Sequence, residues 1–359
     1  MDLAIVAITL ISLVFTTDSS EGIRFFFRIF LCFLMSNLIV KDTNYIKAFC
    51  KGLIICATII VISIYLQMLF PDQMLSVYKY TLKTGAYEFS KLCYDWNRAY
   101  SGICGYTNIS AFFSSILCGY IFFYAIERIN ERKTSKAVIC LLFSFLVLYA
   151  IILTNKRSIF MITIVELTFI MLFPRMNGKL GKRIVTIIFV ISVIVLYPLL
   201  DTNIIMISFW NRLIGLGTSS IAEYSNGRFE IYKAVLYGFD NWIVGYGAGS
   251  SESVLAHAGG LHNIYLQIFY ENGLVGVALW LVLFVTNLLS AFKRSSQAPN
   301  IMLLLSIYVQ ILFLTYGLSG NPLYDETIFC CYCIFSIMPY CTKTGGATYE
   351  PIRRNNNIS

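Results

Sequence analysis

Repeated apolar runs constrain this chain more than any other feature, because each is about long enough to cross a lipid bilayer. A helix needs about 20 consecutive apolar residues for such a crossing. The runs lie at about 3–20, 22–40, 52–70, 109–126, 137–154, 158–174, 184–200, 273–291, 300–317 and 327–341. They predict an all-α polytopic membrane protein with about ten transmembrane helices.

The composition excludes several classes of protein. Of the 359 residues, 58% are hydrophobic and only 13% are charged, and the mean hydropathy is +0.72. A soluble domain carries about a quarter charged residues, so this chain lacks the polar surface of a water-facing globule. A cytosolic enzyme, a nucleic-acid-binding domain and a disordered chain are therefore excluded.

The distribution of lysine and arginine predicts the orientation in the membrane. With the N-terminus in the cytoplasm, the inner segments 41–51, 127–136, 175–183, 292–299 and 342–359 carry 16 of these cations. The outer segments carry 9, although they are much longer. Cytoplasmic loops are enriched in such cations. We therefore expect both termini in the cytoplasm, and we interpret the net charge of +8 as this bias.

Residues 1–341 are expected to form a single transmembrane domain, followed by a polar cytoplasmic tail at 342–359. Two outer loops are long. The loop at 71–108 mixes polar and aromatic residues, which suits a segment lying in the membrane interface. The loop at 201–272 is too long to lack structure, so we expect it to fold or to dock on the helices.

Both histidines of the chain, His257 and His262, lie in the loop at 201–272. Histidine is the side chain best suited to accept a proton near neutral pH, so either is a candidate base. An ordinary surface or capping histidine is the alternative interpretation.

Several cations lie on the predicted outer side and could bind an anion. Arg228 follows Ser225 and Asn226, either of which could cap a helix and place its N–H groups beside the guanidinium. Lys156 and Arg157 occupy a very short outer turn, although lysine and arginine are usually enriched on the cytoplasmic side. The alternatives are a solvated arginine for Arg228 and contact with anionic lipid headgroups for the turn. Arg98, before the fourth run, could instead extend along the membrane interface.

Ionisable residues inside the apolar runs are costly and often functional. Arg28 and Glu166 are the clearest examples. A buried ion pair between them would explain both residues as well as a functional role would. Asp325 and Glu326, in the last outer turn, could receive a proton or a cationic group, or be plain loop acids.

No Asp-x-Asp pair occurs in the chain. Many glycosyltransferases that use nucleotide sugars hold a metal ion with that pair. We therefore expect no metal or other cofactor, and expect arginine and lysine to neutralise any diphosphate.

The stretch from Arg228 to Gly276 resembles the signature of the bacterial O-antigen polymerase and O-antigen ligase superfamily. The matching residues are Arg228, Tyr232, Gly245, Gly247, His262-Asn263-Ile264-Tyr265-Leu266, Glu271, Gly273 and Gly276. Tyr232 stands where the family often has tryptophan. Gly260 replaces a histidine of the pattern, and His257 is displaced from that position. Thr154 to Ser158 resembles a Thr-x-Ser-Arg turn of the family with Lys156 in place of serine, and Arg98, Gly102 and Asn108 resemble a looser pattern.

The resemblance implies a glycosyltransferase type C-like helical bundle in the bacterial cytoplasmic membrane, with its active site on the periplasmic face. The donor would be a glycan on undecaprenyl diphosphate, and the acceptor a sugar hydroxyl of a second glycan. His262, Arg228 and Arg157 are the implied catalytic residues. The implied substrate-binding residues are Arg98, Lys156, Asn263, Tyr232 and His257. The other expected partners are membrane lipid and a candidate chain-length regulator protein. No nucleic-acid partner is expected.

Three functions stay open at this point. A polymerase would transfer the glycan to another lipid-linked repeat unit, and a ligase would transfer it to lipid A–core. The absence of the His-x-His pattern favours the polymerase. A polysaccharide transporter or flippase is the alternative from another class, but the chain shows no internal repeat of the kind that marks many transporters.

Overall fold

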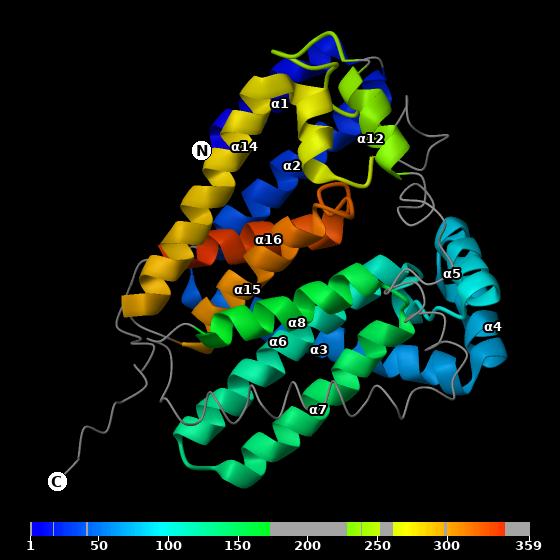
Figure 1. Cartoon of the computed structure of the whole chain (residues 1–359), viewed down its shortest axis with the longest axis vertical. Coiled ribbons are helices and arrows are strands. Elements are labelled where there is room, and N and C mark those ends of the chain that lie inside the picture. Colours follow the sequence, from blue (N-terminus) through cyan, green and yellow to red (C-terminus); the bar gives the residue numbers. More distant parts are fainter. Residues whose placement is uncertain are drawn as a thin grey trace. The chain divides into compact units, whose positions relative to one another are not determined.

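Helices form the regular secondary structure of the described part of the chain, where no strand occurs. The computed structural model describes residues 2–16, 18–40, 42–172, 228–237, 239–251, 261–297 and 300–341 (Figure 1). The expected span at 184–200, His257 and the tail at 342–359 lie outside the described residues. Most of the expected loop at 201–272 lies outside them as well.

Within the described residues, most helices follow the apolar runs of the sequence, and the others lie in the expected outer loops. The helices are α1 (Asp2–Ser12), α2 (Ser19–Val40), α3 (Thr43–Leu69), α4 (Pro71–Thr81), α5 (Thr84–Asn97), α6 (Thr107–Asn130), α7 (Thr134–Leu153), α8 (Arg157–Leu172), α12 (Arg228–Tyr237), α14 (Ile264–Gln297), α15 (Ile301–Tyr316) and α16 (Glu326–Ile337). Short 3₁₀ turns occur at η1 (Leu13–Phe15), η2 (Gly102–Cys104) and η4 (Met338–Tyr340).

Five of the described helices are long and apolar enough to cross a membrane: α2, α3, α6, α7 and α14. Shorter apolar helices occur at Asp2–Phe15, Ile301–Tyr316 and Glu326–Tyr340. In α7, apolar side chains such as Leu142 and Phe143 are exposed, while Leu148 and Ile151 are buried. A helix that is apolar all round suits a lipid environment. The prediction of an all-α polytopic membrane protein is therefore confirmed.

The chain divides into two compact units, which are interleaved in the sequence. Unit 1 comprises residues 1–46, 217–294 and 309–347, and unit 2 comprises residues 47–216, 295–308 and 348–359. Among the described helices, unit 1 holds α1, α2, α12, most of α14 and α16, and unit 2 holds α4 to α8. The single domain expected at 1–341 stays a prediction.

Aromatic rings form the core of unit 1. Phe313 of α15 stacks on Tyr332 of α16, with ring centroids 4.2 Å apart. Trp280 of α14 lies near Phe33 of α2 and Phe329 of α16, at centroid distances of 6.4 and 6.1 Å. Aromatic pairs at such distances add attraction beyond their burial. Four helices from three separate stretches of sequence are thereby held together.

A kink at Gly273 divides α14 into two helical segments. Gly273 has φ 60° and ψ −164°, a non-helical conformation that is open to glycine. Figure 1 shows the chain changing direction there. The expected span at 273–291 begins at this kink, and residues 264–272 form a separate helical segment in the stretch we expected to be loop. A straight helix of all 34 residues would be about 50 Å long, more than one bilayer core needs.

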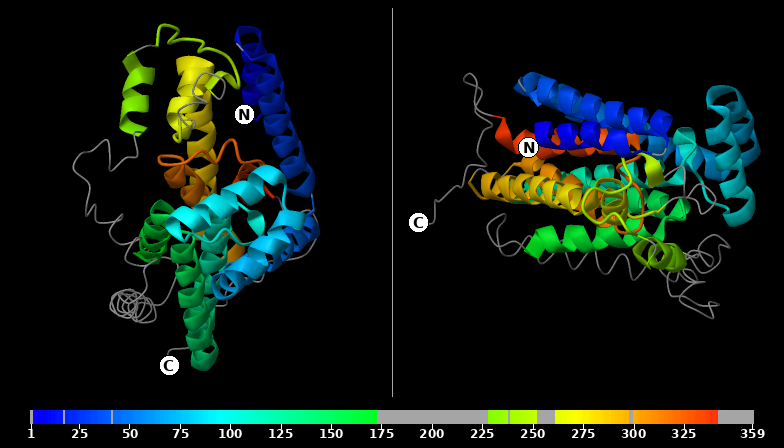
Figure 2. Two further views of the ribbon diagram at one scale, coloured as in Figure 1. Left: turned by 90° about the vertical axis from the view of Figure 1, so that its right-hand side faces the viewer. Right: turned by 90° about the horizontal axis from the view of Figure 1, so that it is seen from above.

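In unit 2, the helices α4 and α5 occupy the expected outer loop at 71–108. They form a hairpin that runs crosswise to α6 and α7 (Figure 2). Polar contacts hold the packed helices together. Ser115 of α6 lies 2.7 Å from the hydroxyl of Thr163 on α8 and 2.5 Å from the phenol of Tyr308 on α15. The end of this unit that carries α5 also carries several of the predicted cations.

Candidate active site

The turn after α15, at residues 317–320, holds together several predicted site residues of unit 1. Three successive carbonyl groups of this turn accept hydrogen bonds. Gly317 accepts from the backbone N–H of Ile264 at 2.9 Å, and Leu318 accepts from Asn263 Nδ2 at 3.3 Å. Ser319 accepts from Arg228 Nη1 at 2.8 Å. The sequence analysis missed this turn, and its only local signal is the pair of glycines at its two ends.

Arg228 and Tyr232 lie on one face of α12, because they are four residues apart in a helix. The Tyr232 hydroxyl donates a hydrogen bond to the carbonyl oxygen of His262 at 3.3 Å. Burial raises the pKa of Tyr232, while the charge of Arg228 and a hydrogen bond with Asn263 act to lower it. A phenol is neutral at neutral pH even at its ordinary pKa of about 10, and the Tyr232 hydroxyl is the donor in this contact.

His262 has a positive φ of 49°, which is uncommon for a residue other than glycine. It lies two residues before the start of α14 and is partly buried. The next residue, Asn263, caps the helix. Its Oδ1 accepts from the backbone N–H groups of Tyr265 and Leu266 at 3.0 and 3.1 Å. With Nδ2 bonded to Leu318, Asn263 fixes the backbone on which His262 stands.

The Gly-x-Gly loop at Gly245 and Gly247 packs against other backbone segments of unit 1. Gly247 has φ 95°, and its N–H donates to the carbonyl of Glu271 at 3.0 Å. A Cβ atom at Gly247 would overlap the backbone of Thr16. The Thr16 hydroxyl in turn donates to the carbonyl of Ala248 at 2.8 Å. Glycine is therefore required here because two backbone segments approach closely.

Unit 2 carries a second group of predicted residues, at the ends of α5, α7 and α8. Arg98 follows α5 with φ 50°, and its guanidinium lies 4.7 Å from the ring centroid of Tyr94. Two residues later, the N–H of Tyr100 donates to the carbonyl of Leu153 at the end of α7, at 2.9 Å. Arg157 then begins α8. The loop with Arg98 and the turn with Arg157 therefore lie at the same end of unit 2.

The charges of these cations affect the pKa values of neighbouring ionisable groups. Burial raises the pKa of Cys93, and the charge of Lys156 acts in the opposite direction. Burial likewise raises the pKa of Tyr100, and the charge of Arg98 opposes that rise. Lys156 and Arg157 are partly buried, whereas Arg98 is exposed. This end of unit 2 therefore carries three cationic side chains, the residue types that bind anions.

The structure therefore gathers the predicted site residues into two groups, one in each unit. Unit 1 holds Arg228, Tyr232, His262 and Asn263 around the turn at 317–320. Unit 2 holds Arg98, Lys156 and Arg157. The eighth predicted residue, His257, lies outside the described residues.

Arg28, predicted as a costly charge in α2, has a partner in unit 1. Its Nε lies 3.4 Å from Glu326 Oε1, and its guanidinium lies 5.4 Å from the ring centroid of Tyr324. This contact is an ion pair within unit 1, and a functional role for Glu326 stays a prediction. Asp325 caps α16 by accepting from Thr327 and Ile328 N–H. Glu166 lies in unit 2 and is 3% exposed.

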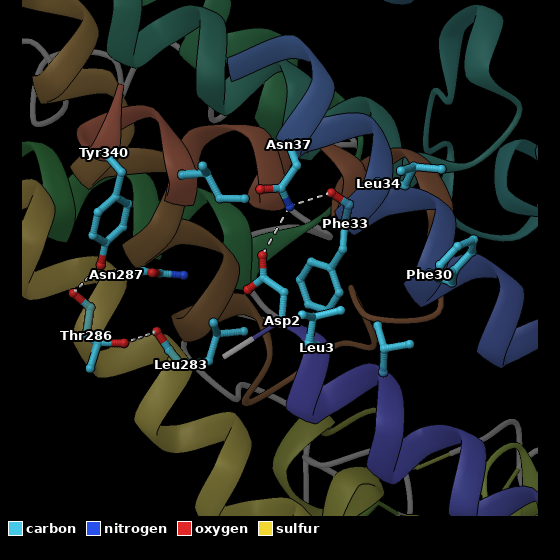
Figure 3. Close-up of a pocket in the computed structure, with 12 residues that line it drawn as sticks. Asp2, Leu3, Phe30, Phe33, Leu34, Asn37, Leu283, Thr286, Asn287 and Tyr340 are labelled. Carbon is cyan, nitrogen blue, oxygen red and sulfur yellow. Dashed lines mark hydrogen bonds between the residues drawn. The ribbon is translucent and has the colours of Figure 1, made fainter. Parts of the chain in front are cut away.

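A cavity of about 660 Å³ lies elsewhere in unit 1, between α1, α2, α14 and the 3₁₀ turn η4 (Figure 3). Asp2, Asn37, Asn287 and Tyr340 supply polar groups to a largely apolar lining. Asn37 Nδ2 donates to Asp2 Oδ2 at 3.3 Å. None of the predicted site residues lines this cavity. Within the described ranges, no group of three or more His, Cys, Asp or Glu side chains could hold a metal ion.

Comparison with known families gives a match to part of the chain. Residues 142–281 match the family model described as O-Antigen ligase. This range includes Arg157, Arg228, Tyr232, His262 and Asn263. No curated protein matches the chain.

Proposed function

We propose that this chain, which carries a region of the O-antigen polymerase and ligase superfamily, is a membrane glycosyltransferase that polymerises lipid-linked repeat units. It transfers a glycan from undecaprenyl diphosphate to a sugar hydroxyl of another lipid-linked repeat unit. One observation carries this proposal: Arg228 and the segment that bears His262 bind to successive carbonyl groups of one turn. A cation and a proton acceptor are thereby held in the same part of unit 1.

The reaction needs both groups. The bond between the anomeric carbon and the diphosphate oxygen breaks, and the electron pair leaves with the diphosphate. Arg228 stabilises that negative charge by charge-assisted hydrogen bonds. The acceptor oxygen attacks the anomeric carbon and gives its proton to His262. Arg157, with Arg98 and Lys156, is assigned the same electrostatic role as Arg228.

A ligase is the second candidate, because the matching family model is described as O-Antigen ligase. The two activities share the donor and differ in the acceptor. Gly260, in the position where the family pattern has a histidine, favours the polymerase.

The decisive experiment supplies purified protein in lipid vesicles with lipid-linked repeat units and a chelator, without nucleotide. A polymerase gives a ladder of longer glycans on the carrier lipid. A ligase gives a product only when lipid A–core is added. Movement of the repeat unit across the membrane without chain growth would show a transporter and contradict the proposal.

A matched pair of variants tests the site. Arg228→Ala is expected to lower the rate about 100-fold or more, the usual effect of removing a group that stabilises developing charge. Arg24→Ala removes an exposed arginine that pairs with Glu21 at 2.5 Å, and should leave the rate unchanged. Full activity in Arg228→Ala would refute its role.

The proposed orientation has its own test. Reporter tags at the two ends of the chain should both respond only to cytoplasmic reagents. A tag in the segment between α4 and α5 should respond to periplasmic ones.

A further inference from the structure

Glu271 is a buried carboxyl group that the reaction outlined above does not use. It lies in the last turn of the first segment of α14, two residues before the kink, and is 1% exposed. Its Oε1 accepts three hydrogen bonds. The donors are Ser251 Oγ at 2.6 Å, Gln267 Nε2 at 3.2 Å and the hydroxyl of Tyr324. A buried polar group with this many partners specifies the arrangement of the segments that supply them.

The three donors come from different parts of the sequence. Ser251 ends the described part of the Gly-x-Gly loop, and Gln267 lies one helical turn before Glu271. Tyr324 lies between the turn at 317–320 and α16. In addition, the backbone carbonyl of Glu271 accepts from Gly247 N–H at 3.0 Å. One residue thus joins the loop, the first segment of α14 and the chain after α15.

Tyr324 is itself held firmly. Its ring stacks on Phe25 of α2 at a centroid distance of 4.8 Å, and the guanidinium of Arg28 lies over it at 5.4 Å. Arg28 also pairs with Glu326. The hydrogen bond from Tyr324 therefore ties Glu271 to a fixed point of the unit.

The same segments carry the candidate site. His262 and Asn263 stand at the start of the helical segment that ends near Glu271. The turn at 317–320, which accepts from Arg228, begins seven residues before Tyr324. A shift of the Glu271 junction would therefore move His262 relative to the turn that holds Arg228.

We propose that Glu271 is a positioning residue, whose hydrogen bonds to Ser251, Gln267 and Tyr324 set the placement of His262 relative to Arg228. This proposal rests on the proposed function of that site. The geometry uses one oxygen as a triple acceptor. The backbone N–H of Gly249 also favours the charge on this carboxyl group. A glutamine removes that charge but keeps an acceptor oxygen for the three side-chain donors.

The test compares Glu271→Gln with Glu271→Ala in the full-length protein. We expect Glu271→Gln to keep at least half of the wild-type kcat. Glu271→Ala should lose about tenfold or more in kcat with KM within twofold, because misplaced reacting groups mainly slow the chemical step. The exposed Glu230→Ala on α12 is the control and should be unchanged. Wild-type kcat in Glu271→Ala, or equal losses in both Glu271 variants, would overturn the proposal.

Two milder variants keep the test valid if Glu271→Ala does not fold. Tyr324→Phe and Ser251→Ala each remove one donor and leave the carboxyl group in place. Each should lower kcat about threefold to tenfold, as expected for one buried hydrogen bond. Unchanged kcat in both would overturn the proposal.

Amide hydrogen exchange separates this proposal from the proposed function. In Tyr324→Phe, the amides of Gly247 and Ile264 should exchange faster than in the wild type, whether or not the protein polymerises glycans. If exchange accelerates but no wild-type activity is found, the proposed function fails while the junction stands. If exchange stays at the wild-type rate, the positioning proposal fails and the proposed function is unaffected.

Discussion

The hydroxyl of Tyr232 donates a hydrogen bond to the backbone carbonyl of His262, with 3.3 Å between the two oxygens. This contact joins α12 to the start of α14 across 30 residues of sequence. It links the helix that begins with Arg228 to the residue proposed as the base. Tyr232 therefore contributes a polar contact as well as an aromatic ring.

Tyr232→Phe tests this contact. The variant keeps the ring and removes the hydroxyl, so a loss of about threefold to tenfold in kcat is expected for one hydrogen bond. Steady-state kinetics of repeat-unit polymerisation measure it. Tyr340→Phe is the control, since its hydroxyl bonds to Ser290 at the other end of α14, at 2.7 Å. Equal rates for Tyr232→Phe and wild type would show that this contact does not support the reaction.

His262→Asn separates the backbone role of His262 from its proposed role as the base. Asparagine tolerates the positive φ of this position better than most residues, so the thermal unfolding temperature should stay within a few degrees. The variant cannot accept the proton in the same way, and kcat should fall about 100-fold to 10,000-fold. A fully active His262→Asn would restrict this residue to a structural role.

Arg157→Ala tests the second group of cations. We expect product formation to fall about 100-fold or more while the amount of protein in the membrane stays the same. Quantitative blotting and gel analysis of the glycan ladder measure the two quantities. Lys91→Ala, on the exposed face of α5 in the same unit, should have wild-type activity. If both variants are fully active, the assignment of unit 2 to the diphosphate is wrong.

Asp325 gives a prediction for stability and its pH dependence. Burial raises the pKa of Asp325 above the ordinary value of 3.8, despite bonds from Thr327 and Ile328 N–H that act to lower it. The folded protein therefore binds this proton more tightly than the unfolded chain does. The carboxyl group should destabilise the fold as pH rises from about 3.8 through the raised pKa, and its full penalty applies above that pKa.

Asp325→Asn keeps an N-cap for α16 without the charge, so we expect it to unfold at an equal or higher temperature than wild type at pH 7. Asp325→Ala loses the cap and should be less stable than Asp325→Asn by about 1 kcal/mol. Thermal unfolding in detergent between pH 4 and pH 7 measures both. Asp240→Asn, in an exposed loop, is the control. A less stable Asp325→Asn at pH 7 would contradict the inferred effect of burial.

The helices were largely predictable because hydropathy and capping are local properties. The runs at 22–40, 52–70 and 137–154 correspond to α2, α3 and α7. Most of the helix ends lie within a few residues of the ends of these runs. The start of α14 at Ile264 could also have been found, because Asn263 is a strong capping residue. The sequence analysis placed the start at 273 instead, because the helical segment before Gly273 is too short to be recognised as a membrane span.

The site was predictable only as a set of residue types. Arg228, Tyr232, His262 and Asn263 were selected from the sequence, yet the turn at 317–320 that holds them was not. Glu271 was noticed only as part of a motif, and nothing local identifies Ser251 and Tyr324 as its donors.

The sequence by itself determined that this chain is a helical membrane protein, because hydropathy sums over neighbouring residues and any sufficiently long apolar helix is stable in a bilayer. It also determined which side chains could bind an anion or take a proton. Only the tertiary structure decided which of them meet. Arg228 and Ser319 are 91 residues apart, and Asn263 and Leu318 are 55 apart. Contacts at such separations depend on how whole helices pack, and no pattern of neighbouring residues encodes them.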